Sequence, residues 1–482
     1  MWQETKITGY APDLPADTPG VLVDTTNVIP TVRGIASGYQ ITPTADAINS
    51  GVLGSARLLK LDGTERAYIG TASKLYEYTF GTGLTDRSDT AYTATSWSFT
   101  QVGDVSLAAC TGNIIRKSTG GAFSALGVAP VPKAGIICTV GPPSSYQVMA
   151  FDYDDGVNHY SDGWFCSALG DYTNWTVSLA TQCANGRLID EPGPFTAAIA
   201  YRDGVIAFKA SAMYEGTYVG DTTNGIIWSW RKIASDIGCC GRNMVTKAND
   251  VIYFADRRGV WMWDGSYPKL VPGQVHDSWA QKVQNLSTTV TEPKQVYWDQ
   301  DTHTLFVAYN KSGVSNTPQY LCWSSLSGLW THHSFISSSG NTANVQMLIG
   351  RKIATPAAGV YCVTDNTSAA TGVIARPSTI NTTLALWTIG NQNDQVVVDR
   401  VAPVFLAGST PGASSTATLV AASNLMSTGT LTTVSPTIES GLRWFDATVA
   451  GNFITTTLSF TGAFELSKVG MSVSGAGASG KR

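Results

Sequence analysis

The chain has 482 residues, of which 14% are charged and 43% hydrophobic, and its formal net charge is −4 at pH 7. Lys and Arg are scattered singly, with no run longer than Arg257-Arg258. Nucleic-acid binding rests on cationic side chains that neutralise phosphates. The composition therefore argues against tight binding of nucleic acid. An acidic surface that faces nucleic acid without binding it remains an alternative. The length predicts two or three structural units.

Residues 1–50 are expected to form an extended N-terminal arm. Prolines punctuate this segment too densely for a helix. Its first residues lack the basic and apolar regions of a signal peptide, and the chain has no apolar run long enough to span a bilayer. We therefore expect synthesis and folding in a cytoplasm. The prolines are Pro12, Pro15, Pro19, Pro30 and Pro43.

A pattern of strand, tight turn and aromatic strand recurs through residues 51–375. Its clearest copy joins Val251–Phe254 to Val260–Trp263 through a polar turn, and both strands are apolar on both faces. First strands of the clearer copies begin near Val205, Val251, Leu305 and Tyr361. By subtraction, these starts lie 46, 54 and 56 residues apart. Such periods are typical of β-propeller blades, whose two faces pack against neighbouring blades.

These features predict an all-β protein with a propeller of about six to seven blades over residues 51–375. Any all-β chain rich in Gly and aromatic residues forms hairpins, but these copies also share an order of features. Only Ser278–Asn285 resembles a helix. Tyr253, Trp261 and Trp263 are predicted to be core residues of a blade and not ligand contacts.

The C-terminal region, 376–482, has a different texture and is predicted to be β-rich, to serve assembly or form a tip, and to end in a flexible tail. Two tracts rich in Ser, Thr, Ala and Gly, Thr364–Thr383 and Gly408–Gly441, are interpreted either as flexible linkers or as long hairpin tips. Strands with alternating apolar residues are Gln395–Leu406, Ala417–Ala422, Gly441–Val449, Phe453–Phe460 and Ala463–Ser474. With the N-terminal arm they should form a platform whose open strand edges are covered by another chain.

Three segments of the chain resemble known site motifs. Gly475–Gly480 matches G-x-G-x-x-G, but the strand before and helix after it that pyrophosphate binding needs are not indicated. His332-His333 would point to opposite faces of a strand and so cannot readily chelate one metal. An acidic segment resembles a cation loop but lacks the later bidentate Glu, so a solvated turn is favoured. Its residues are Asp152, Asp154, Asp155, Gly156, His159 and Asp162.

No G-x-S-x-G elbow occurs in the chain. We therefore expect no enzyme, no catalytic, cofactor-binding or metal-ligating residues and no cofactor; a hydrolase of the propeller type is kept only as an alternative. The cysteines form no C-x-x-C pair and lie in apolar or small-residue contexts, which predicts reduced, mostly buried thiols. They are Cys110, Cys138, Cys166, Cys183, Cys239, Cys240, Cys322 and Cys362.

Pro19–Gln40 resembles the opening of the tail nozzle, hub or tubular B-type proteins of short-tailed (podovirus-type) bacteriophages. The D-x-x-N-x-x-P-x-x-x-G pattern of that family falls on Asp24, Asn27, Pro30 and Gly34. The block from Gly170 to Gly265 and the ending Thr457–Gly475 are also similar to that family. The pieces of the central block are the Trp175 segment, the Asp190–Pro194 turn, the Lys209–Tyr214 hairpin, Ile237-Gly238-Cys239 and Trp263-Asp264-Gly265. The resemblance covers about half of the chain and leaves out Ser339–Gly441.

The resemblance implies a virion structural protein located in the phage tail and assembled in the cytoplasm of the host bacterium. It implies a homo-oligomeric ring, usually a homohexamer, docked beneath the adaptor ring below the portal. Such a nozzle retains packaged DNA and forms the DNA conduit for viral genome ejection, with the adaptor ring protein and a tail fibre or spike as partners. Six chains would carry a charge of about −24, which discourages adhesion of DNA to the wall. The alternative is a receptor- or glycan-binding propeller of a tail tip or fibre, with exposed Trp and Tyr as sugar platforms.

Overall fold

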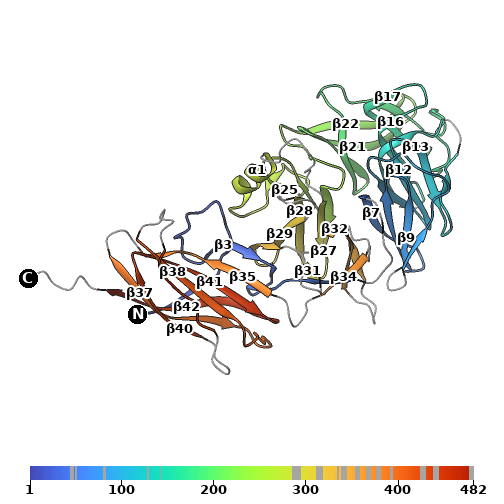
Figure 1. Ribbon diagram of the computed structural model, residues 1–482. Coiled ribbons are helices and arrows are strands. Elements are labelled where there is room, and N and C mark those ends of the chain that lie inside the picture. The colour runs from blue at the N-terminus through green and yellow to red at the C-terminus, as the bar shows by residue number, and fades with distance from the viewer. Residues whose placement is uncertain are drawn as a thin grey trace, which may run out of the picture.

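The protein consists of a β-propeller and a β-sandwich, as a computed structural model shows (Figure 1). Among the described residues, no helix is both long and apolar enough to cross a bilayer. The structure describes residues 1–43, 48, 51–79, 83–127, 130–142, 144–284, 295–310, 318–333, 336–337, 345–352, 359–364, 371–375, 381–390, 394–423, 430–437 and 444–476. The prediction of an all-β fold is confirmed.

The propeller has seven blades of four antiparallel strands each; an eight-stranded sheet accounts for two of them and divides at the single pairing of Ile114 with Lys133. From inner to outer strand, the first blade is β7 (Val52–Leu59), β8 (Glu65–Thr71), β9 (Leu75–Thr79) and β10 (Gly83–Asp86), and the second is β11 (Ser98–Val102), β12 (Val105–Cys110), β13 (Asn113–Ser118) and β14 (Ser124–Ala125). The third blade is β15 (Lys133–Val140), β16 (Gln147–Asp154), β17 (His159–Cys166) and β18 (Asn185–Arg187), the fourth is β19 (Phe195–Tyr201), β20 (Gly204–Lys209), β21 (Ala212–Asp221) and β22 (Ile226–Ser235), and the fifth is β23 (Val245–Ala248), β24 (Val251–Ala255), β25 (Val260–Trp263) and β26 (Lys269–Leu270). The sixth blade is β27 (Gln295–Asp299), β28 (Thr304–Asn310), β29 (Pro318–Ser324) and β30 (Trp330–His333), and the seventh is β32 (Val345–Lys352), β33 (Gly359–Thr364) and β34 (Thr371–Ala375) with β6 (Gln40–Pro43). Each inner strand contacts the inner strands of the two neighbouring blades, and β32 contacts β7, so the ring is closed.

The seventh blade takes its outer strand from the N-terminal region. Strand β6 pairs antiparallel with β34, so that Thr42 lies opposite Val373, and the short β31 (Ile336–Ser337) pairs with the other edge of β6. The chain therefore contributes the last strand of the ring before it forms the first blade. This pairing closes the propeller without a covalent link.

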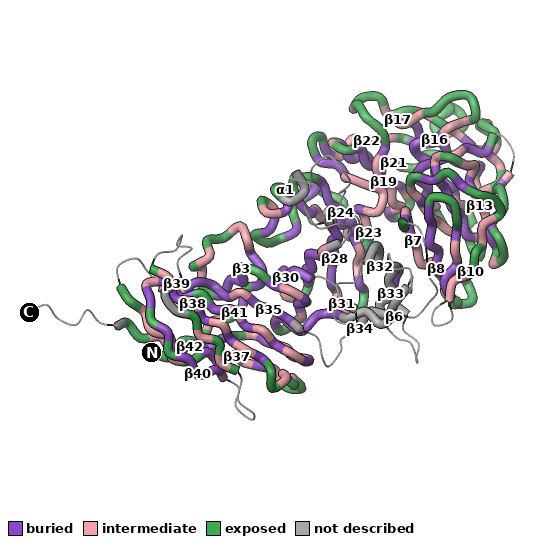
Figure 2. Tube along the Cα trace, viewed as in Figure 1, coloured by how far each residue is buried: buried purple, intermediate pink, exposed green. Residues whose placement is uncertain are grey.

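The sandwich is built from strands of both chain regions, as the sequence predicts for the platform. Sheet A contains β1 (Trp2–Lys6), β4 (Val28–Pro30), β5 (Ile35–Ser37), β42 (Glu465–Ala476), β37 (Gln395–Phe405) and β40 (Phe445–Gly451). Sheet B contains β2 (Gly9–Tyr10), β3 (Val21–Thr26), β35 (Asn381–Leu386), β41 (Phe453–Thr461), β38 (Thr416–Ala422), β39 (Thr430–Val434) and β36 (Ile389–Gly390). Alternate residues of the two sheets form the core, as in β40, where buried and exposed residues alternate over its whole length (Figure 2). N-terminal strands thus cover edges of C-terminal strands within one chain.

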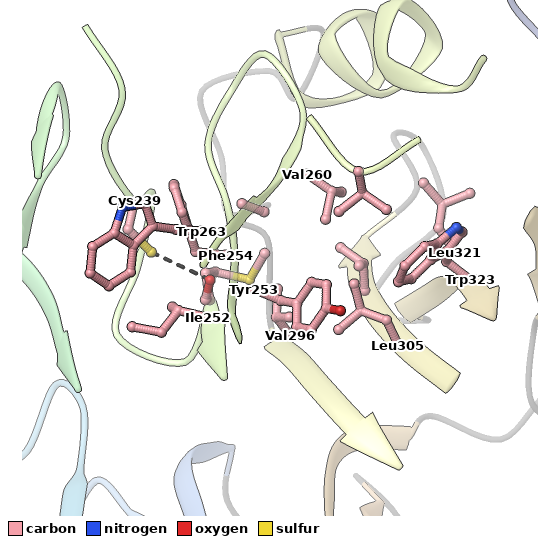
Figure 3. Close-up of a cluster of buried hydrophobic side chains, with 14 of the residues drawn as sticks. Cys239, Ile252, Tyr253, Phe254, Val260, Trp263, Val296, Leu305, Leu321 and Trp323 are labelled. Atoms are coloured by element: carbon pink, nitrogen blue, oxygen red, sulfur yellow. Dashed lines mark hydrogen bonds between the residues drawn. The ribbon is translucent and has the colours of Figure 1, made fainter. Parts of the chain in front are cut away.

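The β24–β25 hairpin buries both of its faces, as its sequence predicts (Figure 3). Tyr253 stacks on Trp298 of the next blade, with ring centroids 5.4 Å apart. Trp263 contacts Tyr201 of the preceding blade at 4.8 Å. Trp261 is only half-buried: its indole N–H donates to Asp256 in the turn at 2.8 Å. The core prediction is therefore confirmed for Tyr253 and Trp263, whereas Trp261 packs at the rim because it lies beside this polar turn.

Hydrogen bonds join the sandwich to the propeller. The hydroxyl of Thr25 in β3 donates to the carbonyl of His332 in β30 at 3.1 Å and accepts from its backbone N–H at 2.7 Å. Helix α1 (His276–Gln284) confirms the predicted helix, although Asn285 lies outside the described residues. Asp13 accepts hydrogen bonds from the N–H groups of Asp277 and Ser278, at 3.0 and 2.8 Å, and so caps the start of this helix.

Candidate functional site

A hollow among the described residues occupies the central channel of the propeller, with a cavity volume of about 820 Å³. It is lined by the inner strands of five consecutive blades, β7, β11, β15, β19 and β23, and by the segment that leads into β23. Its charged lining residues are Arg57, Arg242 and Lys247, with no Asp or Glu among the lining residues. The channel wall is therefore polar and carries cations.

Acidic groups behind the wall compensate two of these cations. The Arg57 guanidinium lies 2.5 Å from a carboxylate oxygen of Glu65 in the same blade. Arg242 reaches from the start of the fifth blade to Asp152 in the third, at 2.8 Å. Lys247 is exposed to the channel. The channel can accommodate a hydrated polar or anionic group, but its charge supports only weak attraction.

Hydroxyl groups in the channel wall join neighbouring blades. The Ser98 hydroxyl donates to the carbonyl of Ile137 at 3.2 Å and accepts from the N–H of the same residue at 3.1 Å. The hydroxyls of Thr100 and Thr139 lie 2.9 Å apart. Because these bonds link the second blade to the third, the hydroxyls hold the wall together, and none is adjacent to a base that would activate it as a nucleophile.

A smaller pocket of about 340 Å³ lies between the third and fourth blades. The side-chain amide of Gln147 at its base donates to the carbonyls of Ser167 and Gln182, at 2.9 and 2.7 Å. The amide oxygen accepts from the indole N–H of Trp228 at 3.0 Å. Asp203 is the one ionisable carboxyl in the lining. The side-chain amide of Gln147 is therefore hydrogen-bonded within the protein and has a structural role. The lining of the pocket lacks the paired acid and base of a hydrolytic site.

In the acidic segment that resembles a cation loop, Asp155 and Asp162 form hydrogen bonds with nearby residues, as expected for a turn between strands. The carboxylate of Asp155 accepts backbone hydrogen bonds from Val157 and Asn158 at 2.8 Å, and the bond from Asn158 is the largest cause that lowers its pKa. The side-chain hydrogen bond from Arg187 lowers the pKa of Asp162. Asp152 instead joins His159, 2.8 Å away, to Arg242. The described residues contain no cluster suited to a metal ion.

The two adjacent histidines point to opposite sides, as predicted. The His332 ring contacts the carbonyl of Thr25 at 3.1 Å and the hydroxyl of Tyr309 at 2.9 Å. His333 is fully buried with its ring beside Tyr39, at 6.2 Å between centroids. Burial, followed by the neighbouring His332, lowers the pKa of His333 to about 3. Both rings therefore belong to the junction between the propeller and the sandwich.

The cysteines described by the structure are free thiols, which confirms that prediction for seven of the eight. All of the seven except the half-buried Cys240 are buried. Burial raises the pKa of Cys138 and Cys239 to about 12, so these thiols stay protonated and unreactive at neutral pH. The side chain of Cys362 and most of the Gly475–Gly480 motif lie outside the described residues.

Sequence reasoning missed the channel residues Arg57, Arg242 and Lys247. The alternation of a strand indicates which residues share a face, but it does not tell which face lines a channel or which distant residue lies opposite. Arg242 in particular precedes its strand and pairs with a residue 90 positions away. The one available signal was that Arg57 and Lys247 lie within expected strands of the propeller region.

Comparisons with known proteins found neither a matching family model nor a matching curated protein. Solved structures with similarity include YCF48 bound to D1 peptide, at 10% identity, with a TM-score of 0.42 over 72% of this chain and 97% of that one. They also include the extracellular domain of BT4673 from B. thetaiotaomicron, at 10% identity, with a TM-score of 0.45 over 74% of this chain and 45% of that one. BBS1N in complex with ARL6DN is 11% identical, with a TM-score of 0.39 over 72% of this chain and 98% of that one. The propeller assignment accordingly rests on the order of strands within the sheets.

Proposed function

We propose that the protein is a structural component of a short-tailed bacteriophage tail, a ring-forming nozzle below the portal and its adaptor. In this role it retains packaged DNA and forms the conduit for ejection. The supporting observation is that the N-terminal and C-terminal segments that resemble nozzle proteins lie together. Strand β5 pairs with β42, so that Ala36 lies opposite Glu465 and Ile35 opposite Leu466.

The residues of the nozzle-like pattern have structural roles at this contact. Asn27 is buried and adopts a left-handed backbone conformation with φ of 58° between β3 and β4. Gly34 lies so close to β42 that a Cβ would come within 2.2 Å of the carbonyl oxygen of Leu466. The Thr31 hydroxyl donates to Glu465 at 2.8 Å. The pattern thus builds a fixed joint between two distant chain segments, which explains why these residue types occur at this spacing.

The architecture suits a wall module. The strands of a propeller blade form backbone hydrogen bonds with one another, and both faces of the blade pack against neighbouring blades, which makes the blades rigid. In this proposal the conduit lies on the axis of the ring, between subunits, and not in the channel of one propeller. The negative net charge of the chain keeps DNA adhesion weak.

The receptor- or glycan-binding alternative has less support. Sugar platforms need exposed aromatic rings. Among the large side chains that are more than a third exposed in the described part, the aromatic ones are Trp2 and Tyr267, at 47% and 56%. Trp2 belongs to the sandwich and Tyr267 follows β25 in the propeller, so they form no common platform.

Electron microscopy of the purified protein and of virions tests the proposal. We expect a ring of six copies on the tail axis, directly below the portal and adaptor. Filter binding at physiological salt should detect no tight duplex affinity. A protein located at fibre tips, or one that holds duplex DNA at nanomolar strength, would refute the nozzle function.

A further inference from the structure

We propose that the pocket between the third and fourth blades binds the cationic side chain of a partner polypeptide, the ammonium group of a lysine or the guanidinium group of an arginine. The pocket has a volume of about 340 Å³ and is lined by residues of both blades. It combines an aromatic corner with a carboxylate that has no cationic partner among the described residues. Binding at this pocket does not depend on the nozzle function.

Two aromatic rings of the fourth blade form a corner in the pocket wall. Tyr218 of β21 and Trp228 of β22 both line the pocket, with ring centroids 5.8 Å apart and planes inclined by 68°. Aromatic rings attract organic cations, and pockets walled by several such rings are a recurrent way to bind ammonium groups. A cation that enters this corner can therefore contact both rings.

Hydrogen bonds hold the two rings in place. The indole N–H of Trp228 donates to the side-chain oxygen of Gln147 at 3.0 Å, and the hydroxyl of Tyr218 donates to the side-chain oxygen of Gln182. Both acceptors belong to the third blade, so the corner is fixed between two blades. A ligand therefore meets a site that needs little ordering, which lowers the cost of binding.

Asp203 is the one charged side chain in the described lining of the pocket. It lies in the turn between β19 and β20, where Tyr201 pairs with Gly204. Its neighbour Arg202 points toward the fifth blade, because the guanidinium carbon lies 4.9 Å from the ring of Tyr201, which packs on Trp263. The Asp203 carboxylate forms no ion pair with a described residue. The pocket therefore presents an uncompensated negative charge, which favours a cationic ligand.

The size and the surroundings of the pocket favour a polypeptide as the source of the cation. Its volume is at the lower end of the range of roughly 300–1,000 Å³ that is usual for ligand pockets, so it suits a single side chain. Leu179 and Ile226, near the aromatic corner, are 49% and 47% exposed. The two lie close together, because a Cβ at Gly225 would be 4.0 Å from Leu179. Residues that flank the cation in a polypeptide can cover these apolar side chains, whereas a free amine cannot.

Saturation-transfer NMR with the purified protein tests the class of ligand. The probes are N-acetyl-lysine N-methylamide and its neutral analogue N-acetyl-norleucine N-methylamide. We expect saturation of the lysine side-chain protons, with n-butylammonium as a competitor, and several-fold weaker saturation of the norleucine probe. Equal saturation of the two probes would overturn the cation site.

Asp203→Asn tests the carboxylate while keeping the shape of the side chain. The variant should raise the Kd of the lysine probe about two- to fivefold, because exposed ion pairs contribute modestly. Asp250→Asn is the matched control in the corresponding turn of the fifth blade; the residues that precede the two carboxylates, Arg202 and Asn249, have φ of 51° and 53°. An unchanged Kd in Asp203→Asn, or the same increase in both variants, would overturn the role of Asp203.

A capped tripeptide with lysine between two leucines distinguishes a polypeptide from a free amine. We expect it to bind several-fold more tightly than n-butylammonium, and Leu179→Ser should remove this advantage without weakening n-butylammonium. Equal affinity of the tripeptide and the amine for the wild-type protein would overturn the assignment to a polypeptide. Failure of every cationic probe to bind would overturn the site but leave the nozzle function, which electron microscopy tests separately.

Discussion

Acidification should loosen the junction between sandwich and propeller through His333. The folded protein lowers the pKa of His333 from 6.5 to about 3 because the ring is buried. Between these values the unfolded chain binds a proton that the folded chain does not, so stability falls as the pH drops below 6.5. Simple linkage gives a loss of roughly 3 kcal/mol between pH 7.5 and pH 4.5, and about 5 kcal/mol below pH 3.

Urea denaturation at pH 7.5 and 4.5 measures this effect. Carboxylates also contribute to acid sensitivity, so the informative quantity is the difference between wild type and His333→Phe, which cannot be protonated. We expect the variant to lose roughly 3 kcal/mol less than wild type over this pH range. Equal pH dependence in wild type and His333→Phe would show that His333 is not held neutral by the fold.

Three further predictions concern packing and thiols. Trp263→Ala should lower the free energy of unfolding by roughly 3–5 kcal/mol because the ring is fully buried between blades; an unchanged melting temperature would contradict the blade assignment, and Tyr267→Ala, at an exposed site, is the control. Gly34→Ala should destabilise the sandwich because the new Cβ would meet the carbonyl of Leu466; wild-type thermal stability would contradict the close approach. Thiol labelling of the native protein should be slow and reducing agents should leave its stability unchanged, whereas rapid labelling of Cys239 would show that this thiol is accessible.

Local patterns predicted much of the fold because each blade is a local structure. The apolar faces of Val251–Phe254 and Val260–Trp263 are sufficient to indicate a strand pair packed on both sides, since only neighbouring blades can bury both. The alternation within Gln395–Leu406 and Phe453–Phe460 similarly predicted β37 and β41. In each case the signal is the pattern of apolar residues within the strand itself, and it does not depend on which segment packs against that strand.

Long-range pairing could not be predicted in the same way. Nothing local marks Gln40–Pro43 as the outer strand of the seventh blade, because pairing partners are chosen by the whole fold and not by the strand itself. The contact of Arg242 with Asp152 and the helix cap from Asp13 are likewise set by segments that meet only after folding. The channel lining was missed for this reason, while the assignment of His332 and His333 to opposite faces needed only the geometry of one strand.

The closure of the propeller by β6 constrains the order in which this chain can fold. Thr42 and its partner Val373 are 331 residues apart by subtraction of their numbers, so β6 leaves the ribosome long before β34 exists. Contacts of such high sequence separation form slowly and leave partly folded chains exposed to aggregation. The first six blades can fold during synthesis, but the ring closes only once β34, Thr371–Ala375, has been made. A chain released before that point would therefore carry an open propeller in which the seventh blade is incomplete.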